Sequence, residues 1–231
     1  AALAVVSDLE ARQALGWGLS ENRLPRLPNP IRTEDYRVLP EAGAFRKRWG
    51  LDDRKIILFL GRLNPIKGID ILIRACAGLV ASLSLVVAGP DDGQESELRQ
   101  LAQTRLGDRV TFTGFLNHQE KMSAMTDADV CVLPSRSEIF GMVALESIMC
   151  STPIILSSAC GLASELSHSA GVFEFESENE DDLMKKLEIA IGNDAEISDM
   201  ATTREQVIGQ FSLEAVVRDA ASIYERSISE F

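Results

Sequence analysis

The sequence predicts an α/β protein built on a doubly wound parallel sheet. From residue 55 onward, apolar strand patterns alternate with segments whose apolar residues repeat at helical spacing. Most of the strand candidates are near-continuous apolar runs, which is typical of strands buried on both faces of a parallel sheet. Because parallel neighbours need right-handed crossovers, we expect helices on both faces of this sheet.

The elements follow in chain order. Five strands are expected, at Ile56–Leu60, Ser84–Ala88, Val110–Thr113, Val130–Leu133 and Ile154–Leu156. The first helix is expected within residues 68–82, on a buried stripe formed by Ile69, Leu72, Ile73, Cys76, Leu79 and Val80. Further helices are expected at about 95–105, 118–126, 142–150, 180–192 and 213–229.

The first 30 residues have a different pattern. A short strand is expected at Leu3–Val6, followed by a helix over about Asp8–Leu15. Three prolines follow, which exclude helix and favour extended backbone: Pro25, Pro28 and Pro30. Residues 1–27 therefore resemble a βα unit of something that precedes the main domain.

Composition narrows the class of function. Hydrophobic residues make up 45% and charged residues 25%, as in ordinary globular domains. The net charge of −12 disfavours nucleic acid or an anionic membrane as the main partner, although local cations and helix N-termini can still bind phosphate. No apolar run approaches the length of a transmembrane helix, and no signal peptide is evident.

The cysteines and histidines form no recognisable ligand set. The four cysteines contain no CxxC pair, so we expect reduced, structural thiols and a cytoplasmic protein: Cys76, Cys131, Cys150 and Cys160. The only histidines, His118 and His168, are far apart in the sequence, and we expect no metal site.

Candidate ligand-binding residues follow the strands, because ligands of open α/β sheets bind at the carboxyl ends of the strands. In residues 61–68, Gly61 permits a close turn, and Arg62 with Lys67 would suit a diphosphate. The same two cations could instead be merely solvated. Gly89 follows the second strand and could form a simple turn, whereas Phe115 could support a flat base or belong to the core.

The segment PSRSEIFGMVALE is the most informative. Glu138 and Glu146 are eight residues apart, and Gly141 opens a helix whose first N–H groups are free. These N–H groups and Glu138 could hold sugar hydroxyls while Glu146 reaches a ribose. The alternative is a surface acid and an ordinary helix carboxylate.

Taken together, the motifs resemble the C-terminal domain of family-four, group 1 retaining glycosyltransferases of the GT-B fold. The matching pieces occur in the family's order over roughly residues 24–229: LPNPI, FLGRLNPIKGID, VVAGP, VTFTGFL, PSRSEIFGMVALE, GLASE and FSLEAVV…IYE. The resemblance implies a Rossmann-like half of a GT-B enzyme. It further implies a remnant of the acceptor domain with its linker at 1–27, a nucleotide-sugar-binding domain at 28–210 and a crossover helix at 211–231.

The resemblance also assigns roles. Arg62 and Lys67 match the basic pair that binds the donor diphosphate and stabilises the leaving group, and Glu138 matches the glutamate that contacts the donor sugar. Glu146 matches the glutamate that binds ribose hydroxyls. Backbone amides are expected to hold the sugar at Ile139, Phe140 and Gly141, and to approach phosphate at Met142 and Val143; Gly61, Gly89 and Phe115 are expected around the nucleotide.

These roles imply transfer of a hexose from a nucleotide sugar, UDP being favoured, with retention of configuration and without a metal or other cofactor. The acceptor-binding domain is expected to lie outside this sequence, so the isolated chain would be inactive or weakly active, and any membrane association would come from that domain. Two alternatives remain: a non-catalytic nucleotide-sugar-binding or partner module that depends on another chain, and a different GT-B enzyme such as a sugar-nucleotide epimerase.

Three positions depart from the family pattern. Ser151 stands where a glycine usually precedes Thr-Pro, Cys160 replaces the first glycine of a GGxxE-like loop, and LPNPI replaces PNG. The first leaves the local backbone geometry open, and the second leaves open how the loop covers the donor. The amphipathic C-terminal helix is built on Leu213, Val216, Val217, Ala220 and Tyr224, and its stripe is expected to be partly exposed or repacked.

Overall fold

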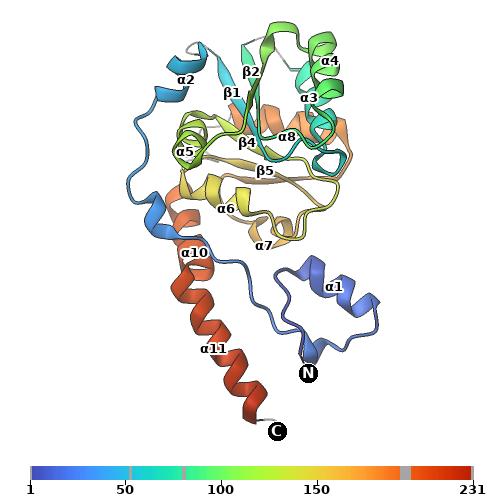
Figure 1. Cartoon of the computed structure of the whole chain (residues 1–231), viewed down its shortest axis with the longest axis vertical. Helices are drawn as coiled ribbons and strands as arrows, with labels where there is room; N and C mark the ends of the chain where they lie inside the picture. Colours follow the sequence, from blue (N-terminus) through green and yellow to red (C-terminus); the bar gives the residue numbers. More distant parts are fainter. Residues whose placement is uncertain (1, 52–53, 80–81, 193–198, 230–231) are drawn as a thin grey trace.

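A computed structural model of the chain describes residues 2–51, 54–79, 82–192 and 199–229. Six parallel strands form one sheet in the order β3-β2-β1-β4-β5-β6 (Figure 1). Their bounds are β1 Lys55–Leu60, β2 Leu83–Ala88, β3 Val110–Gly114, β4 Val130–Leu133, β5 Ile154–Ser157 and β6 Val172–Phe175. The five predicted strands are confirmed. β6 was not predicted, because this edge strand is only half buried and its VFEF sequence shows no apolar run.

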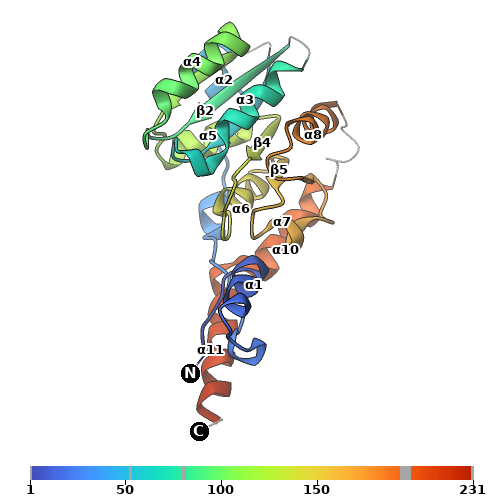
Figure 2. The same cartoon turned by 90° about the vertical axis from the view of Figure 1, so that its right-hand side faces the viewer.

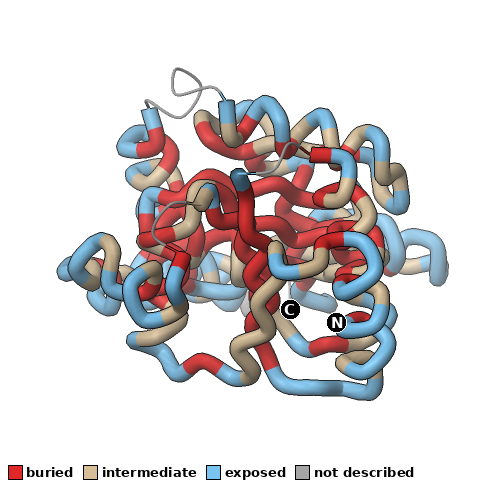
Figure 3. The backbone as a smooth tube through the Cα atoms, turned by 90° about the horizontal axis from the view of Figure 1, so that it is seen from above, coloured by how far each residue is buried: buried red, intermediate tan, exposed pale blue. Residues whose placement is uncertain are grey.

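Helices cover both faces of the sheet, as predicted. Side chains of β1 alternate: Ile56 and Leu58 belong to one core cluster, Ile57 and Phe59 to the other. The first face is covered by α2 (Ala44–Trp49), α5 (His118–Asp127), α6 (Met142–Met149) and α10 (Met200–Phe211), and the second by α3 (Ile69–Ala77), α4 (Glu95–Arg105) and α8 (Glu180–Gly192). Figure 3 shows the buried strands at the centre, between these two layers.

Most predicted helices match the structure within one or two residues. The first sheet helix is shorter than its stripe indicated, since α3 ends at Ala77, and the stripe residue Val80 lies outside the described residues. The helices α2, α7 (Ala163–Leu166) and α10 were not predicted. Two of them are only one or two turns long, and α10 buries just one side of a polar sequence that contains two threonines and a glycine. Short 3₁₀ turns complete the chain: η1 Glu21–Arg23, η2 Thr33–Tyr36, η3 Pro65–Lys67 and η4 Gly107–Arg109.

The N-terminal unit differs from its prediction in one respect. Helix α1 runs over Asp8–Gly16, as expected, with Ser7 as its N-cap. The strand expected at Leu3–Val6 is reduced to an isolated parallel bridge between Val5 and Arg26, next to which the Leu3 N–H donates to the Arg23 carbonyl oxygen at 2.8 Å. Pro25 stands opposite Leu3 and has no N–H to donate, so the parallel ladder does not extend from Val5 toward Leu3.

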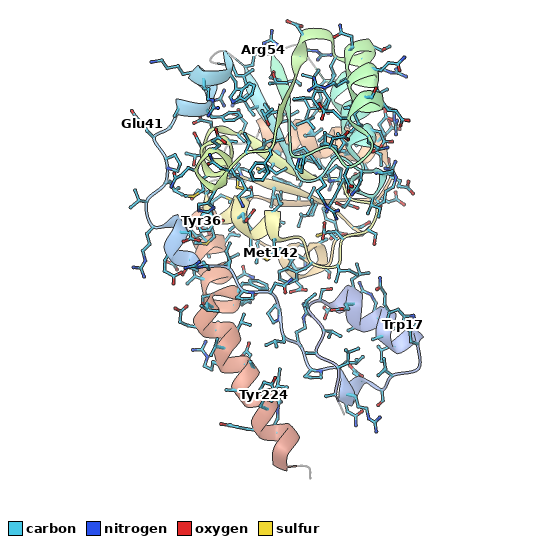
Figure 4. All side chains as sticks on the ribbon, viewed as in Figure 1. Trp17, Tyr36, Glu41, Arg54, Met142 and Tyr224 are labelled. Atoms are coloured by element: carbon cyan, nitrogen blue, oxygen red, sulfur yellow. The ribbon has the colours of Figure 1, made fainter. Side chains whose placement is uncertain are left out.

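Helix α11 (Leu213–Ser229) leaves the main domain, and the N-terminal unit lies beside its far end (Figures 1 and 2). Ala215 and Val216 are buried, whereas Leu213, Val217 and Tyr224 are exposed, so the stripe is partly exposed as expected. Trp17 and Tyr224 both project from these two segments outside the sheet domain (Figure 4). Among the described residues, no helix combines the length and apolarity needed to cross a bilayer.

The four cysteines are free and buried, in agreement with the expected structural role. Burial raises the pKa of the Cys76 thiol to about 12, and that of Cys131 likewise. A thiol that stays protonated at neutral pH is a poor nucleophile, so these side chains act as small core residues.

Candidate functional site

The candidate site lies where the strand order reverses, between β1 and β4. These strands are paired only at Ile57–Val130 and Leu58–Cys131, and they separate toward their carboxyl ends. A crevice at such a switch point is the usual ligand site of an open α/β sheet. The loops after β1 and β2 meet at Gly61 and Gly89, and the loops after β1 and β4 meet through Lys67 and Glu138, which is where the sequence predicted the ligand-binding residues.

Close backbone packing shapes the floor of the crevice. A Cβ on Gly89, whose φ is +149°, would lie 1.8 Å from the Gly61 carbonyl oxygen. A Cβ on Gly68 would lie 2.1 Å from the carbonyl oxygen of Pro134, the residue after β4. Glycine is therefore required at both positions, and Gly89 is more than the simple turn residue that the sequence left open.

A pocket of about 330 Å³ opens beside this floor. Phe115 lines it and is 73% exposed, so the core interpretation of this residue is wrong. The pocket brings together Gly61, Arg62, Gly89, Phe115, Val143 and Glu146, all of them predicted, with Leu60, Ala88, Pro90, Leu116 and Lys121. Its mixture of apolar walls and a few convergent polar groups is typical of small-molecule sites.

The two predicted cations differ in environment. The Arg62 side chain is 66% exposed and pairs with Asp92, its Nη1 lying 3.1 Å from Oδ2. Asn64 also donates to Asp92, at 2.8 Å. The Lys67 side chain is about one-fifth exposed, and its Nζ lies 2.5 Å from Oε2 of Glu138. Lys67 and Glu138 thus form a partly desolvated pair, whereas Arg62 is held only by an exposed and weak one.

Five consecutive backbone N–H groups, from Ile139 to Val143, donate no hydrogen bond to any described residue. Gly141 caps α6 with φ +101°, and Met142 stands at the first turn of that helix (Figure 4). The Phe140 side chain is buried against Phe211, so this residue can offer a ligand only its backbone. Unpaired N–H groups at a helix N-terminus attract anions and hydroxyl oxygens.

The loop that contains Cys160 and Gly161 packs against the segment that carries these free N–H groups. Glu138 and Cys160 form a parallel bridge, and Gly161 donates its N–H to the Glu138 carbonyl oxygen at 2.8 Å. The Cys160 thiol donates to the Phe140 carbonyl oxygen at 3.2 Å, and a Cβ on Gly141 would meet Cys160 Sγ at 2.6 Å. Cys160, which departs from the family pattern, therefore packs behind Gly141 as buried support.

Arg136 is a site-supporting residue that the sequence analysis missed. Its guanidinium donates to both carboxylate oxygens of Asp70, each at 2.9 Å, and to the Pro65 carbonyl oxygen at 2.6 Å. The backbone N–H of Arg136 also donates to the Ile66 carbonyl oxygen. Arg136 thereby fastens the loop that carries Arg62 and Lys67 to the loop that carries Glu138. Burial tends to raise the pKa of Asp70, but its hydrogen bonds to Arg136 and Arg74 prevail and lower it.

Lys121 is the second residue missed. It lies on α5 and its Nζ is 2.5 Å from Glu146 Oε1, with 25% and 16% of the two side chains exposed. Glu138 and Glu146, the two glutamates eight residues apart, are therefore each paired with a lysine. In the part of the chain that the structure describes, no three His, Cys, Asp or Glu side chains come close enough to form a metal site.

The strand order, the glycine-lined crevice and the free helix N-terminus define a Rossmann-like α/β protein with its pocket at the switch point. The model of the family "Glycosyl transferases group 1" matches residues 42–206. The chain belongs to this family.

Relatives and solved structures agree with the family assignment. The chain is 32% identical to an uncharacterized glycosyltransferase of Methanocaldococcus jannaschii over 78% of this chain and 47% of that protein. It is 36% identical to a D-inositol 3-phosphate glycosyltransferase of Acidothermus cellulolyticus, over 66% of this chain and 37% of that protein. The chain thus spans less than half the length of these curated relatives.

Among solved structures, the sucrose-phosphate synthase of Thermosynechococcus elongatus superposes with a TM-score of 0.83 at 27% identity, over 99% of this chain and 58% of that one. An Anabaena protein, HepE, solved in complex with UDP and glucose, superposes with a TM-score of 0.85 at 23% identity, over 100% of this chain and 63% of that one. The latter likeness shows the fold alone. Both match the Rossmann-like half predicted from the sequence.

Proposed function

We propose that this chain is the donor-binding part of a retaining glycosyltransferase that transfers a hexose from a nucleotide sugar, with UDP as the favoured nucleotide. The observation that carries the proposal is the convergence of two cations, two lysine-paired glutamates and five free N–H groups on one crevice. Family membership supports sugar transfer in general, and the UDP complexes of the Anabaena structures support the choice of base.

The proposed pose follows the chemistry of the crevice. Gly89 and Phe115 would receive the base, and Glu146 would accept hydrogen bonds from the ribose hydroxyls. Arg62, Lys67 and the N–H groups of Met142 and Val143 would hold the diphosphate, while Glu138 and the N–H groups of Ile139 to Gly141 would hold the sugar. Lys67 can exchange Glu138 for a phosphate oxygen without losing a charged partner.

In the proposed reaction, the bond between the anomeric carbon and the diphosphate oxygen breaks. An acceptor hydroxyl attacks the same face of the sugar, so configuration is retained, and its proton passes to the departing diphosphate. Arg62, Lys67 and the N-terminus of α6 stabilise the charge that develops on the leaving group. No protein nucleophile is required. The acceptor is expected to bind a part of the enzyme outside this chain, which would complete the crevice.

The proposal is tested by thermal unfolding of the 231-residue chain with UDP, GDP, ADP and their sugar conjugates. A ligand present at about 100 times its Kd adds roughly 2.7 kcal/mol to the unfolding free energy, which raises Tm by roughly 5–10 °C in a chain of this length. Arg62→Ala and Glu146→Ala should each abolish most of the rise, whereas Arg99→Ala, whose ion pair with Glu95 lies on α4, should not.

Sugar transfer is then assayed in the protein with its neighbouring sequence restored. Turnover of the nucleotide sugar that stabilises the chain supports the enzyme. Firm donor binding without transfer or hydrolysis would instead favour a non-catalytic binding module. A lack of any nucleotide binding in both forms would overturn the donor-site proposal itself.

A further inference from the structure

Lys121 lines the pocket from helix α5. None of the family motifs includes this helix among the ligand-binding elements. Lys121 lies across the pocket from the Gly61–Arg62 turn, and it lines the same volume as Glu146 and Phe115. Lys67 and Glu138 do not line this pocket, so Lys121 serves a different part of a bound ligand from the Lys67–Glu138 pair.

The position of Lys121 is fixed by its helix. Asn117 caps α5 by accepting the Glu120 N–H at 3.0 Å, and the Glu120 side chain accepts the Asn117 N–H at 3.0 Å. Arg48 also donates to Glu120, at 2.6 Å. Because the first turn is held at three points, Lys121 loses little further freedom when a ligand arrives.

The Lys121–Glu146 pair has hydrogen-bonding groups that remain available to a ligand. Lys121 uses one of its three N–H donors on Glu146, and the second carboxylate oxygen of Glu146 has no partner among the described residues. The pocket therefore presents an ammonium donor directly beside a carboxylate acceptor. A vicinal diol matches this arrangement, because one hydroxyl can donate to the carboxylate while the other accepts from the ammonium.

We propose that Lys121 is a specificity-determining residue that binds the ribose diol together with Glu146 and so selects ribonucleotides over 2′-deoxyribonucleotides. This inference rests on the proposed donor site and names the sugar contact within it. A site built to bond a hydroxyl discriminates strongly against a ligand that lacks it, because the polar groups of the site are then left unpaired. Lys121 does not take part in the chemical step.

The test compares UDP with 2′-deoxy-UDP, by calorimetry, on the unaltered chain and on Lys121→Met and Lys121→Arg. We expect the unaltered chain to prefer UDP by at least about tenfold, equivalent to 1.4 kcal/mol. Lys121→Met should weaken UDP by about 5- to 30-fold, leave 2′-deoxy-UDP within about threefold and so remove the preference, in line with one lost charged hydrogen bond. Lys121→Arg should retain part of the preference for UDP over 2′-deoxy-UDP. Lys185→Met, which removes an exposed lysine of α8 on the other face of the sheet, is the matched control and should change neither affinity.

The possible results distinguish a failure of the proposed Lys121 role from a failure of the proposed donor site. If Lys121→Met weakens UDP and 2′-deoxy-UDP equally, the lysine does not bind the 2′-hydroxyl, and the proposed selection of ribonucleotides is wrong. If Lys121→Met binds UDP as the unaltered chain does, the inference fails while the donor site stands. If the unaltered chain and its longer form bind no nucleotide, both fail. Thermal unfolding of each variant shows that the comparison is made on folded protein.

Discussion

Ser151 adopts a left-handed backbone conformation, with φ 59°, directly after Cys150, the C-cap of α6. The sequence comparison left the geometry open here, because the related family usually has glycine. The structure keeps the conformation that suits glycine and places an exposed serine in it. A residue with a Cβ is strained by roughly 1–2 kcal/mol in this region, whereas glycine is not.

We therefore predict that Ser151→Gly stabilises the chain. The relief of backbone strain should exceed the added entropy of the unfolded chain and leave a gain of roughly 0.5–1 kcal/mol. Urea unfolding at pH 7 measures this change in the unfolding free energy. Ser96→Gly, an exposed substitution within α4, should instead destabilise by roughly 0.5 kcal/mol. Equal losses in both variants would show that Ser151 is not strained.

At the scale of elements, the Arg136–Asp70 contact determines how two loops meet. Asp70 lies in the first turn of α3, and Arg136 lies between β4 and α6. Helix α3 also carries Arg74, which bonds the same carboxylate at 2.7 Å. The loop with Arg62 and Lys67 thus depends on an ionised Asp70 for its position.

This dependence predicts a pH effect. Because the pKa of Asp70 is lowered in the folded chain, its contribution to stability is fully present above its ordinary pKa of about 4. The contribution is lost as pH falls through the folded pKa. We expect Asp70→Asn to cost about 1–3 kcal/mol at pH 7, as for a charged hydrogen bond, and much less at pH 2.5.

Unfolding by urea at both pH values measures this difference. Glu205→Gln on α10, an exposed carboxylate with no hydrogen bond or ion pair to a described residue, is the control and should show no such difference. A cost for Asp70→Asn that stays constant with pH would mean that the carboxylate charge does not hold the loops.

At the scale of the whole molecule, residues 2–27 are joined to the remainder at few points. Arg26 pairs with both Asp8 and Glu165, and a Cβ on Gly161 would meet Ser7 at 2.7 Å. None of these residues lines the ≈330 Å³ pocket. The buried members of the two core clusters begin at Ile31, and in the N-terminal unit only Val6, partly buried, packs against them.

Removal of residues 1–27 should therefore leave the sheet domain folded. We expect Tm to fall by on the order of 5 °C or less, because the ion pairs lost are partly exposed, and nucleotide affinity to stay within about threefold. Removal of residues 212–231 is the contrasting deletion and should cost more, since Ala215 and Val216 are buried. Calorimetry measures the Tm and the nucleotide affinity of each deletion variant. Loss of the folded state in the first deletion would show that the N-terminal unit belongs to the core.

The sequence alone determined the parallel sheet, five of its strands and the residues placed at their carboxyl ends, because buried strands and glycine-rich turns are local patterns. Arg62, Lys67, Glu138 and Glu146 were all found this way; Arg62 and Glu146 line one pocket, and Lys67 is paired with Glu138. Their roles toward a ligand stay predictions. The half-buried edge strand β6 and the polar helix α10 lacked such a local pattern and were missed.

Only the tertiary structure decided which charges meet. Lys121 and Glu146 are 25 residues apart in sequence, and Arg136 and Asp70 are 66 apart, so no local spacing links either pair. In the sequence these side chains look like ordinary surface charges. Lys121 and Glu146 meet at the wall of the pocket, and Arg136 and Asp70 join two loops, because crossovers of the sheet place α5 beside α6 and the end of β4 beside α3. Patterns along a chain report burial, whereas contacts between distant segments depend on how the chain crosses the sheet.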